Sequence, residues 1–279
     1  MLEIFNYEFM QRALIAGSAV AIVSSLLGVF LVLRRMSLMG DGFSHVALGG
    51  VALGMFLSLF LPVSPYWVAL GFAVIAAVGV VKLKEIAKIK GDVSIGIIFS
   101  FALAMGAILF SISNGFSVDL HYFLFGNIIS LGNEDVYAAI GIGAIVLALI
   151  TAYEKELSFM CFDEISAQIG GVATKNLNLM LVILSAIVVV MSMRIVGILL
   201  ISSFLIVPPA AAISVARSFK QALVLSVIFG LISVWAGLLA SYYFDLASGG
   251  SIVMSSIVIF VFCQIYLKIS DTKSKLLPN

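Results

Sequence analysis

Several segments of this sequence are long and hydrophobic enough to cross a lipid bilayer. Residues 13–33 read ALIAGSAVAIVSSLLGVFLVL, and residues 178–193 read NLMLVILSAIVVVMSM. A helix that spans the hydrocarbon core needs about 20 consecutive, mostly apolar residues. The whole chain is 63% hydrophobic and 10% charged, whereas a soluble domain carries roughly 25% charged residues. The sequence therefore predicts an all-α, polytopic integral membrane protein.

The basic residues predict how these segments are oriented. All but two of the 15 Lys and Arg residues fall into five clusters, and such clusters mark cytoplasmic loops. Helices placed between the clusters give nine spans, with the N-terminus outside and the C-terminus in the cytoplasm. The expected spans are about 11–33, 42–61, 65–81, 93–113, 136–153, 177–193, 195–215, 221–242 and 251–268. Eight spans are the alternative, if the segment after residue 33 is broken or re-entrant.

The predicted spans belong to one domain that lacks soluble catalytic motifs. The stretches between spans are short, and small residues recur at a close-packing spacing, as at Gly50 and Gly54. We therefore expect residues 1–279 to form a single transmembrane domain. The chain has no G-x-x-x-x-G-K-S/T loop that would cradle nucleotide phosphates, and neither the H-E-x-x-H nor the G-x-S-x-G motif of hydrolases. The net charge of +1 does not indicate a nucleic-acid partner, and Cys161 and Cys263 are isolated.

Two ionisable residues stand in an otherwise apolar and glycine-rich segment, LRRMSLMGDGFSHVALGGVALG, at residues 33–54. Asp41 and His45 are four residues apart, so on a helix they share one face. Ionisable side chains at membrane depth are costly and tend to face a cavity, a partner or a substrate path. A carboxylate oxygen and an imidazole nitrogen one turn apart form half of a site for zinc, manganese or ferrous iron. Two alternatives remain open: Asp41 could cap a helix, or the two side chains could simply pair.

A second segment, YEKELSFMCFDEISAQIGGVATKN at residues 153–176, lies in a predicted cytoplasmic loop. It has the pattern of a short amphipathic helix. Its apolar residues are Phe162, Ile165 and Ile169, and its polar residues are Asp163, Glu164 and Gln168. The two acids lie near its start, where the helix dipole favours them, and the glycines at 170–171 favour an end there. The segment is either an ordinary surface helix or a docking element for a peripheral partner.

A third feature is the pair Pro208–Pro209 within the hydrophobic run of residues 194–218. Proline removes backbone hydrogen bonds from a helix, and transporters place sites and gates at interrupted helices. The pair therefore predicts either a helix break with a gating role or a kinked structural helix.

Acidic residues collect in the predicted outer segment of residues 113–135. Asp119 and His121 belong to it, and Asp245 adds a further acid in a later outer loop. An acidic outer mouth would raise the local concentration of a cation and attract a basic surface on a delivering protein. Acids in outer loops can equally be solvated without a role.

These segments together resemble the permease subunit of bacterial ABC importers for zinc, manganese or iron. The resemblance rests on four stretches in the family's order: RRMSLMGDGFSHVALGGVALG (34–54), VDLHYFLFGNI (118–128), CFDEISAQIGGV (161–172) and VGILLISSFLIVPPAAA (196–212). The family usually has one proline before its alanine run, where this chain has two. The resemblance implies a fold similar to that of the cobalamin and siderophore importers.

The resemblance also assigns roles to residues. It implies that Asp41 and His45 coordinate the transported metal. It further implies that a coupling helix at about 158–172 docks on a separate ATPase subunit, with Phe162, Asp163, Ala167 and Gly170 matching the family's motif and Glu164 beside them. The family's permeases pair as homodimers, bind two ATPase subunits and receive metal from an extracytoplasmic binding protein.

We therefore expect a permease of the bacterial cytoplasmic (inner) membrane that imports a divalent transition metal, with zinc or manganese ahead of iron. It would be non-catalytic and bind no permanent cofactor. Two ligands in one chain are too few for a metal site, so other helices, water or the second copy must supply the rest. The rival is a proton-coupled secondary transporter or channel without an ATPase. An intramembrane hydrolase that uses Ser44 comes third, because adjacent residues on a helix point about 100° apart and Ser44 cannot form a dyad with His45.

Overall fold

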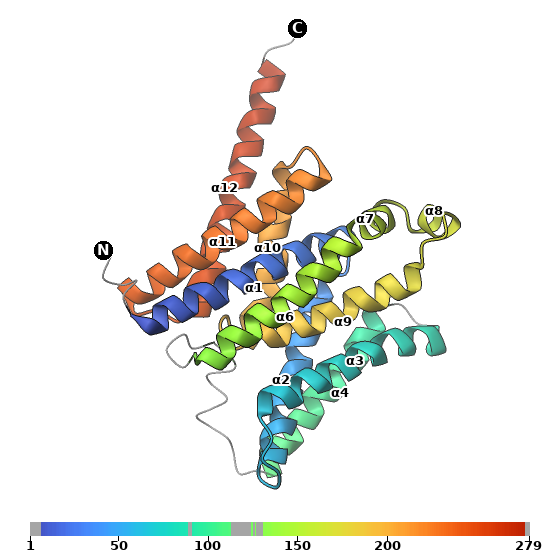
Figure 1. Cartoon of the computed structure of the whole chain (residues 1–279). Coiled ribbons are helices and arrows are strands. Elements are labelled where there is room, and N and C mark those ends of the chain that lie inside the picture. Colours follow the sequence, from blue (N-terminus) through green and yellow to red (C-terminus); the bar gives the residue numbers. More distant parts are fainter. Residues whose placement is uncertain (1–6, 89–90, 113–123, 125, 127–130, 277–279) are drawn as a thin grey trace.

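The computed structural model describes residues 7–88, 91–112, 124, 126 and 131–276, and all regular secondary structure in this part is helical (Figure 1). The helices are α1 (Glu8–Leu33), α2 (Leu38–Ser58), α3 (Pro65–Ala87), α4 (Gly91–Ile112), α6 (Asn133–Ala152), α7 (Glu154–Phe162), α8 (Glu164–Ile169), α9 (Thr174–Ser192), α10 (Ile198–Val215), α11 (Phe219–Phe244) and α12 (Ser248–Leu276). Each of the nine predicted spans coincides with one long helix, and α7 and α8 form the segment between α6 and α9 that the basic residues predict to be cytoplasmic.

Seven of these helices are long and apolar enough to cross a membrane: α1, α3, α4, α6, α9, α11 and α12. The polytopic helical class is therefore confirmed. The other two predicted spans, which correspond to α2 and α10, are not long and apolar enough by the same measure. The apolar part of α10 that meets the hydropathy measure is Leu200–Val215. The chain enters α10 at Gly197, whose φ of +91° lies in the left-handed region. In α2, Asp41, His45 and several glycines dilute the apolar content.

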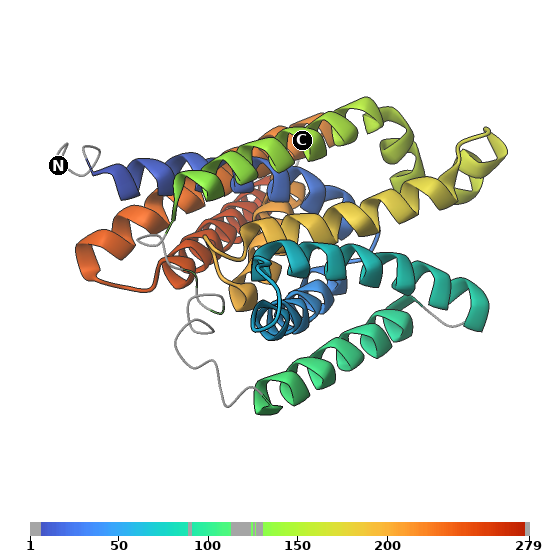
Figure 2. The same ribbon diagram turned by 60° about the horizontal axis from the view of Figure 1, so that its bottom comes forward.

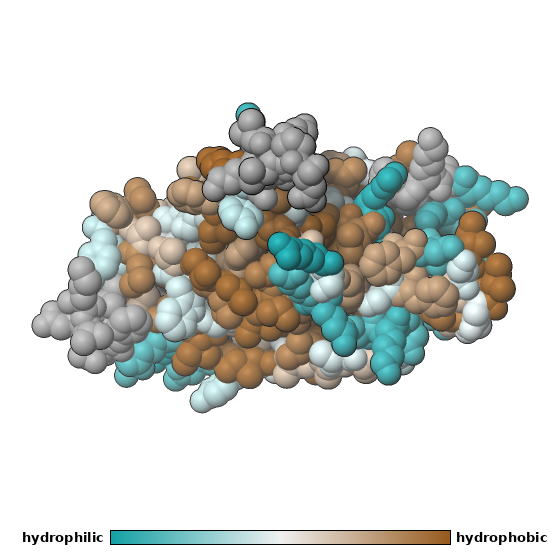
Figure 3. All heavy atoms as spheres, turned by 90° about the horizontal axis from the view of Figure 1, so that it is seen from above, coloured by the Kyte–Doolittle hydropathy of each residue, from teal (hydrophilic) through white to brown (hydrophobic). Residues whose placement is uncertain are grey.

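The bundle is built around α1. This helix packs against α6, α9, α10 and α11, and Figures 1 and 2 show α1, α6, α9 and α11 running side by side in similar directions. Phe30, Phe204 and Leu238 are among the fully buried side chains of the core. Figure 3 shows hydrophobic side chains over much of one face of the molecule. An apolar exterior of this kind is what a bundle surrounded by lipid requires.

The second helix, α2, is held between α3 and α4 at backbone distance. A Cβ on Gly50 would lie 2.8 Å from the Ala69 Cα, and a Cβ on Gly54 would lie 2.6 Å from the Pro65 Cα. On the α4 side, a Cβ on Gly49 would collide with the Ala102 carbonyl oxygen. Only glycine fits at such contacts, so these residues allow the helices to approach closely.

The proline pair does not end a helix. Helix α10 is continuous from Ile198 to Val215 with Pro208 and Pro209 inside it, so the predicted break is not found at this position. Proline at 209 cannot donate to the Leu205 carbonyl one turn earlier, and that oxygen instead faces Gly28 of α1, where a Cβ would clash. The prolines therefore lie where α10 crosses α1, and their gating role stays a prediction.

Candidate functional site

Asp41 and His45 lie in the first two turns of α2 and share one face of it. The His45 Nε2 is 3.9 Å from the Asp41 Oδ1, which is too long for a hydrogen bond but within ion-pair distance. The side chain of Asp41 is 61% exposed and that of His45 is 27% exposed. Helix α2 begins at Leu38 with Ser37 at its N-cap, so Asp41 is inside the helix and does not cap it. The capping alternative is therefore wrong for the described chain.

The pair is partly exposed and is flanked on one side by α4. The His45 ring packs against Phe99 of α4, with centroids 4.8 Å apart. Within the ranges that the structure describes, no group of three or more His, Cys, Asp and Glu side chains could hold a metal ion. Among the described residues, the pair therefore has no third His, Cys, Asp or Glu ligand beside it. Ser44 is buried and donates its hydroxyl to the Gly40 carbonyl, which does not fit a nucleophile activated by His45.

Of the predicted outer residues, the structure describes only Asp245. Asp119 and His121 lie outside the described residues. Asp245 caps the C-terminus of α11 in the left-handed region, with φ +52°, and is exposed. The structure also shows a polar cluster that the sequence did not predict. Arg194, just after α9, pairs with Asp135 of α6, and its Cζ lies 5.3 Å from the centroid of the Tyr66 ring.

The segment between α6 and α9 forms two helices rather than the single helix expected over about 158–172. Helix α7 ends at Phe162, and Asp163 then caps α8 by accepting hydrogen bonds from the backbone N–H groups of Ile165 and Ser166. The Ser166 hydroxyl also donates to Asp163. These bonds, with the hydroxyl of Ser166 foremost and its N–H next, lower the pKa of Asp163. The charged form of Asp163 therefore fixes the corner between α7 and α8.

The apolar side chains of this corner face outward. Phe162 and Ile165 are each 72% exposed and Ile169 is 83% exposed, whereas Ala167 is fully buried against the bundle. Gly170 follows as the C-cap, and Gly171 has a φ of +85°. Exposed apolar side chains outside the spans are typical of a surface that another protein covers.

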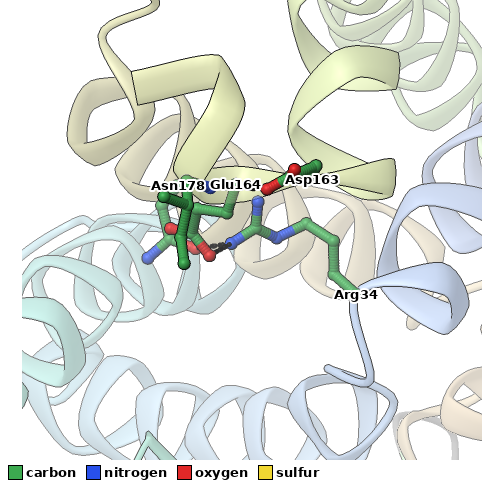
Figure 4. A network of polar contacts seen from close by, with 5 residues as sticks. Arg34, Asp163, Glu164 and Asn178 are labelled. Carbon is green, nitrogen blue, oxygen red and sulfur yellow. Dashed lines mark hydrogen bonds and ion pairs between the residues drawn. The ribbon is translucent and has the colours of Figure 1, made fainter. Parts of the chain in front are cut away.

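A second unpredicted group ties α8 to the main bundle (Figure 4). Arg34 follows the last residue of α1, and its side chain is 9% exposed. Its Nη2 donates to the Glu164 Oε2 at 3.1 Å and to the Asn178 Oδ1 at 3.5 Å. A cavity of about 210 Å³ lies beside these residues. The only sequence signal was that Arg34 and Glu164 are charged residues in two cytoplasmic stretches.

Residues 6–267 match the ABC 3 transport family. The chain belongs to this family. It is 37% identical over 257 residues to the manganese transport system membrane protein MntC of Listeria monocytogenes, and the alignment covers 92% of this chain and 90% of that protein. It is 34% identical over 256 residues to the high-affinity zinc uptake system membrane protein ZnuB of Haemophilus influenzae, and the alignment covers 91% of this chain and 96% of that protein. As a member of the ABC 3 transport family, the protein is a multi-pass membrane permease, and the ATPase is a separate subunit.

Solved structures agree with this assignment. The ABC 3 family chain aligns with PsaBC from Streptococcus pneumoniae in complex with Fab, at a TM-score of 0.84 and 36% identity, over 96% of this chain and 98% of that one. It also aligns with an inward-facing metal-chelate type ABC transporter, at a TM-score of 0.71 and 16% identity, over 94% of this chain and 88% of that one. The second likeness shows the fold alone, so the predicted similarity to cobalamin and siderophore importers in particular stays a prediction.

Proposed function

We propose that this permease imports manganese, zinc or ferrous iron, and that Asp41 and His45 hold the ion during passage. The observation that carries the proposal is their arrangement on α2: an exposed carboxylate and a partly exposed imidazole lie on one face, 3.9 Å apart. Helix α2 itself packs closely against α3 and α4 through its glycines. Ionisable side chains in such a helix are functional by default. Manganese is the first ion to test, because MntC and ScaB relatives at 36–38% identity are named for it.

The ion needs more ligands than the described residues of one chain place beside this pair. Zinc takes four ligands, and manganese takes about six, mostly oxygen. We infer that the protein works as a homodimer, in which the Asp41–His45 pairs of two copies, or water, complete the shell. The partly exposed state of both side chains in a single copy supports this reading. Release also requires that the site bind weakly, as conduction demands.

The ATPase subunit would dock on the corner between α7 and α8. Phe162, Ile165 and Ile169 form an exposed apolar surface there, which suits insertion into a groove of a partner. We keep residues 158–172 as the coupling segment, with Asp163 and Glu164 holding its shape. The C-terminus lies on the same cytoplasmic side in this proposal, because Lys268 and the basic tail follow the positive-inside rule.

The remaining expectations complete the proposed path. All nine long helices cross the membrane, and residues 1–279 act as one permease domain. A binding protein outside the cell delivers the ion to an outer mouth that includes Asp245 and the segment with Asp119 and His121. The contact of α10 with α1 around Pro208 and Pro209 is the candidate gate, since the prolines free backbone groups there.

The test is metal uptake by proteoliposomes that contain the permease, its ATPase and the delivering protein. We expect manganese uptake that requires ATP and continues when a proton ionophore is present. Uptake without ATPase and ATP that collapses with the proton gradient would show a secondary transporter instead. Competition by zinc and iron in the same vesicles then ranks the three ions.

A further inference from the structure

Arg34 stands at the joint between α1 and α2. Its backbone N–H donates to the Phe30 carbonyl, and the Met36 N–H donates to the Leu31 carbonyl, which closes the end of α1. Between them, Arg35 has a φ of +56°, a conformation that a residue with a side chain rarely adopts. The joint is therefore a fixed corner, and α2 with Asp41 begins only a few residues later.

The side chain of Arg34 leaves this corner towards α8 and α9. Figure 4 shows it reaching from the end of α1 to Glu164 at the start of α8 and to Asn178 of α9. The guanidinium is permanently charged, and its Nε and Nη1 are buried without a hydrogen-bond partner. A buried charge with so few partners depends strongly on the partner that carries the opposite charge, and that partner is Glu164.

Glu164 belongs to the segment that faces outward. It follows Asp163, the cap of α8, and it lies in the same short helix as the exposed Ile165 and Ile169. Helix α8 packs against α7 and α9, and Gly171, with a φ of +85°, separates it from α9. A shift of α8 about this glycine would move Glu164 relative to Asn178, the two groups that share one nitrogen of Arg34.

We propose that Arg34 is a positioning residue that transmits movement of α8 to the start of α2, and so to Asp41 and His45. The inference rests on the proposed function, because it takes α8 to be the surface that the ATPase moves. When α8 shifts, the buried guanidinium follows Glu164, and the fixed corner at Arg35 carries α2 with it. Asn178 holds the guanidinium when α8 returns.

The test compares metal ions imported with ATP hydrolysed in proteoliposomes that contain the complete transporter. Arg34→Gln and Glu164→Gln should each lower the number of manganese ions imported per ATP by about tenfold. The double variant should be no worse than either single variant, since both break one contact. Arg34→Lys keeps the charge and should recover part of the ratio. Arg12→Gln, which breaks the exposed Glu8–Arg12 pair within α1, is the matched control and should leave the ratio unchanged.

Provided that the wild type transports, the inference is overturned if Arg34→Gln imports a normal number of manganese ions per ATP. It is also overturned if the losses of the two single variants multiply in the double variant. If Arg34→Gln does not assemble, Glu164→Gln decides alone, because that side chain is half exposed. A second readout is independent of metal: spin labels at the exposed Leu38 and Lys175 report the position of α2 relative to α9. ATP should change their distance in the wild type but not in Glu164→Gln, and an equal change in both would also overturn the inference. If the wild type imports no metal but shows the distance change, only the proposed function fails.

Discussion

His45 follows Asp41 by one turn of α2, and the His45 Nε2 lies 3.9 Å from the Asp41 Oδ1. Metal bonds to imidazole nitrogen and carboxylate oxygen are about 2.1 Å long, so one ion can bridge two atoms that are up to about 4.2 Å apart. The pair can therefore take up an ion with a small side-chain rotation. The same separation is too long for a hydrogen bond that would have to be broken first.

The first prediction concerns this pair. Asp41→Asn and His45→Ala should each reduce manganese uptake in reconstituted vesicles by at least about tenfold, since even outer-shell changes at metal sites cost about 10–100-fold. Folding and ATPase binding should be retained, because Asp41 is largely exposed. Ser44→Ala is the control on the same turn, and it should transport normally. Normal uptake by Asp41→Asn would show that the ion passes elsewhere.

The second prediction concerns the docking surface. Ile169→Asp places a charge on a side chain that is 83% exposed, so the fold should tolerate it. Binding of the ATPase should weaken by roughly thirtyfold, as expected when an apolar interface residue worth about 2 kcal/mol is lost. Co-purification and titration of the purified ATPase measure the effect. Gln168→Asp adds the same charge to α8 beside the apolar surface and should bind almost normally; equal weakening by both variants would point to charge alone.

The third prediction concerns the glycines of α2. Gly50→Ala places a Cβ 2.8 Å from the Ala69 Cα, and such overpacking costs about 1–3 kcal/mol. The thermal midpoint of the purified permease should fall accordingly. Gly71→Ala in α3 is the matched control, because a Cβ there meets no atom within 4 Å. That change should be neutral or slightly stabilising, since alanine favours a helix by about 1 kcal/mol over glycine. A larger loss at Gly71 than at Gly50 would contradict the packing seen between α2 and α3.

The fourth prediction concerns Cys161 in α7. Burial raises the pKa of Cys161 to about 11, although the Arg34 charge works in the opposite direction. Only the thiolate reacts with alkylating reagents, so a pKa raised from 9.0 to about 11 leaves about one hundredth of the thiolate at neutral pH. Alkylation should be correspondingly slow and should speed up about tenfold for each unit of rising pH. A cysteine placed at the exposed Ile169 of α8, in a variant lacking the two native cysteines, gives the reference rate; equal rates would show that the α7 thiol is not protected.

Hydrophobic length and charge predicted the helices well. The predicted span at 177–193 and the observed α9 differ by three residues at the start and one at the end, because the length of an apolar run is set by the bilayer and can be read locally. The division of the cytoplasmic segment at Asp163 was missed. A capping signal was present, because Asp163 stands three residues before Ser166. The amphipathic spacing across residues 162–169 nevertheless favoured one continuous helix.

Contacts between distant residues could not be read from the sequence. Arg34 and Glu164 are 130 positions apart, and a basic residue beside a predicted span indicates topology without naming its partner. The same holds for Arg194 and Asp135. The placement of Asp41 and His45 on one face was predictable, because a spacing of four residues lies within a single helix. Their depth in the membrane depends on how α2 packs, which only the tertiary structure specifies.

The close glycine contacts on both sides of α2 limit how Asp41 and His45 can move. Gly50 lies against Ala69 and Gly49 against Ala102 at backbone distance, so at these two contacts α2 has no side chain that could re-pack into a new register. Sliding or rolling of α2 alone would open empty space or force backbones to collide. Asp41 and His45 therefore move together with α3 and α4, so in the proposed transport cycle a displacement of the pair also displaces roughly a quarter of the chain.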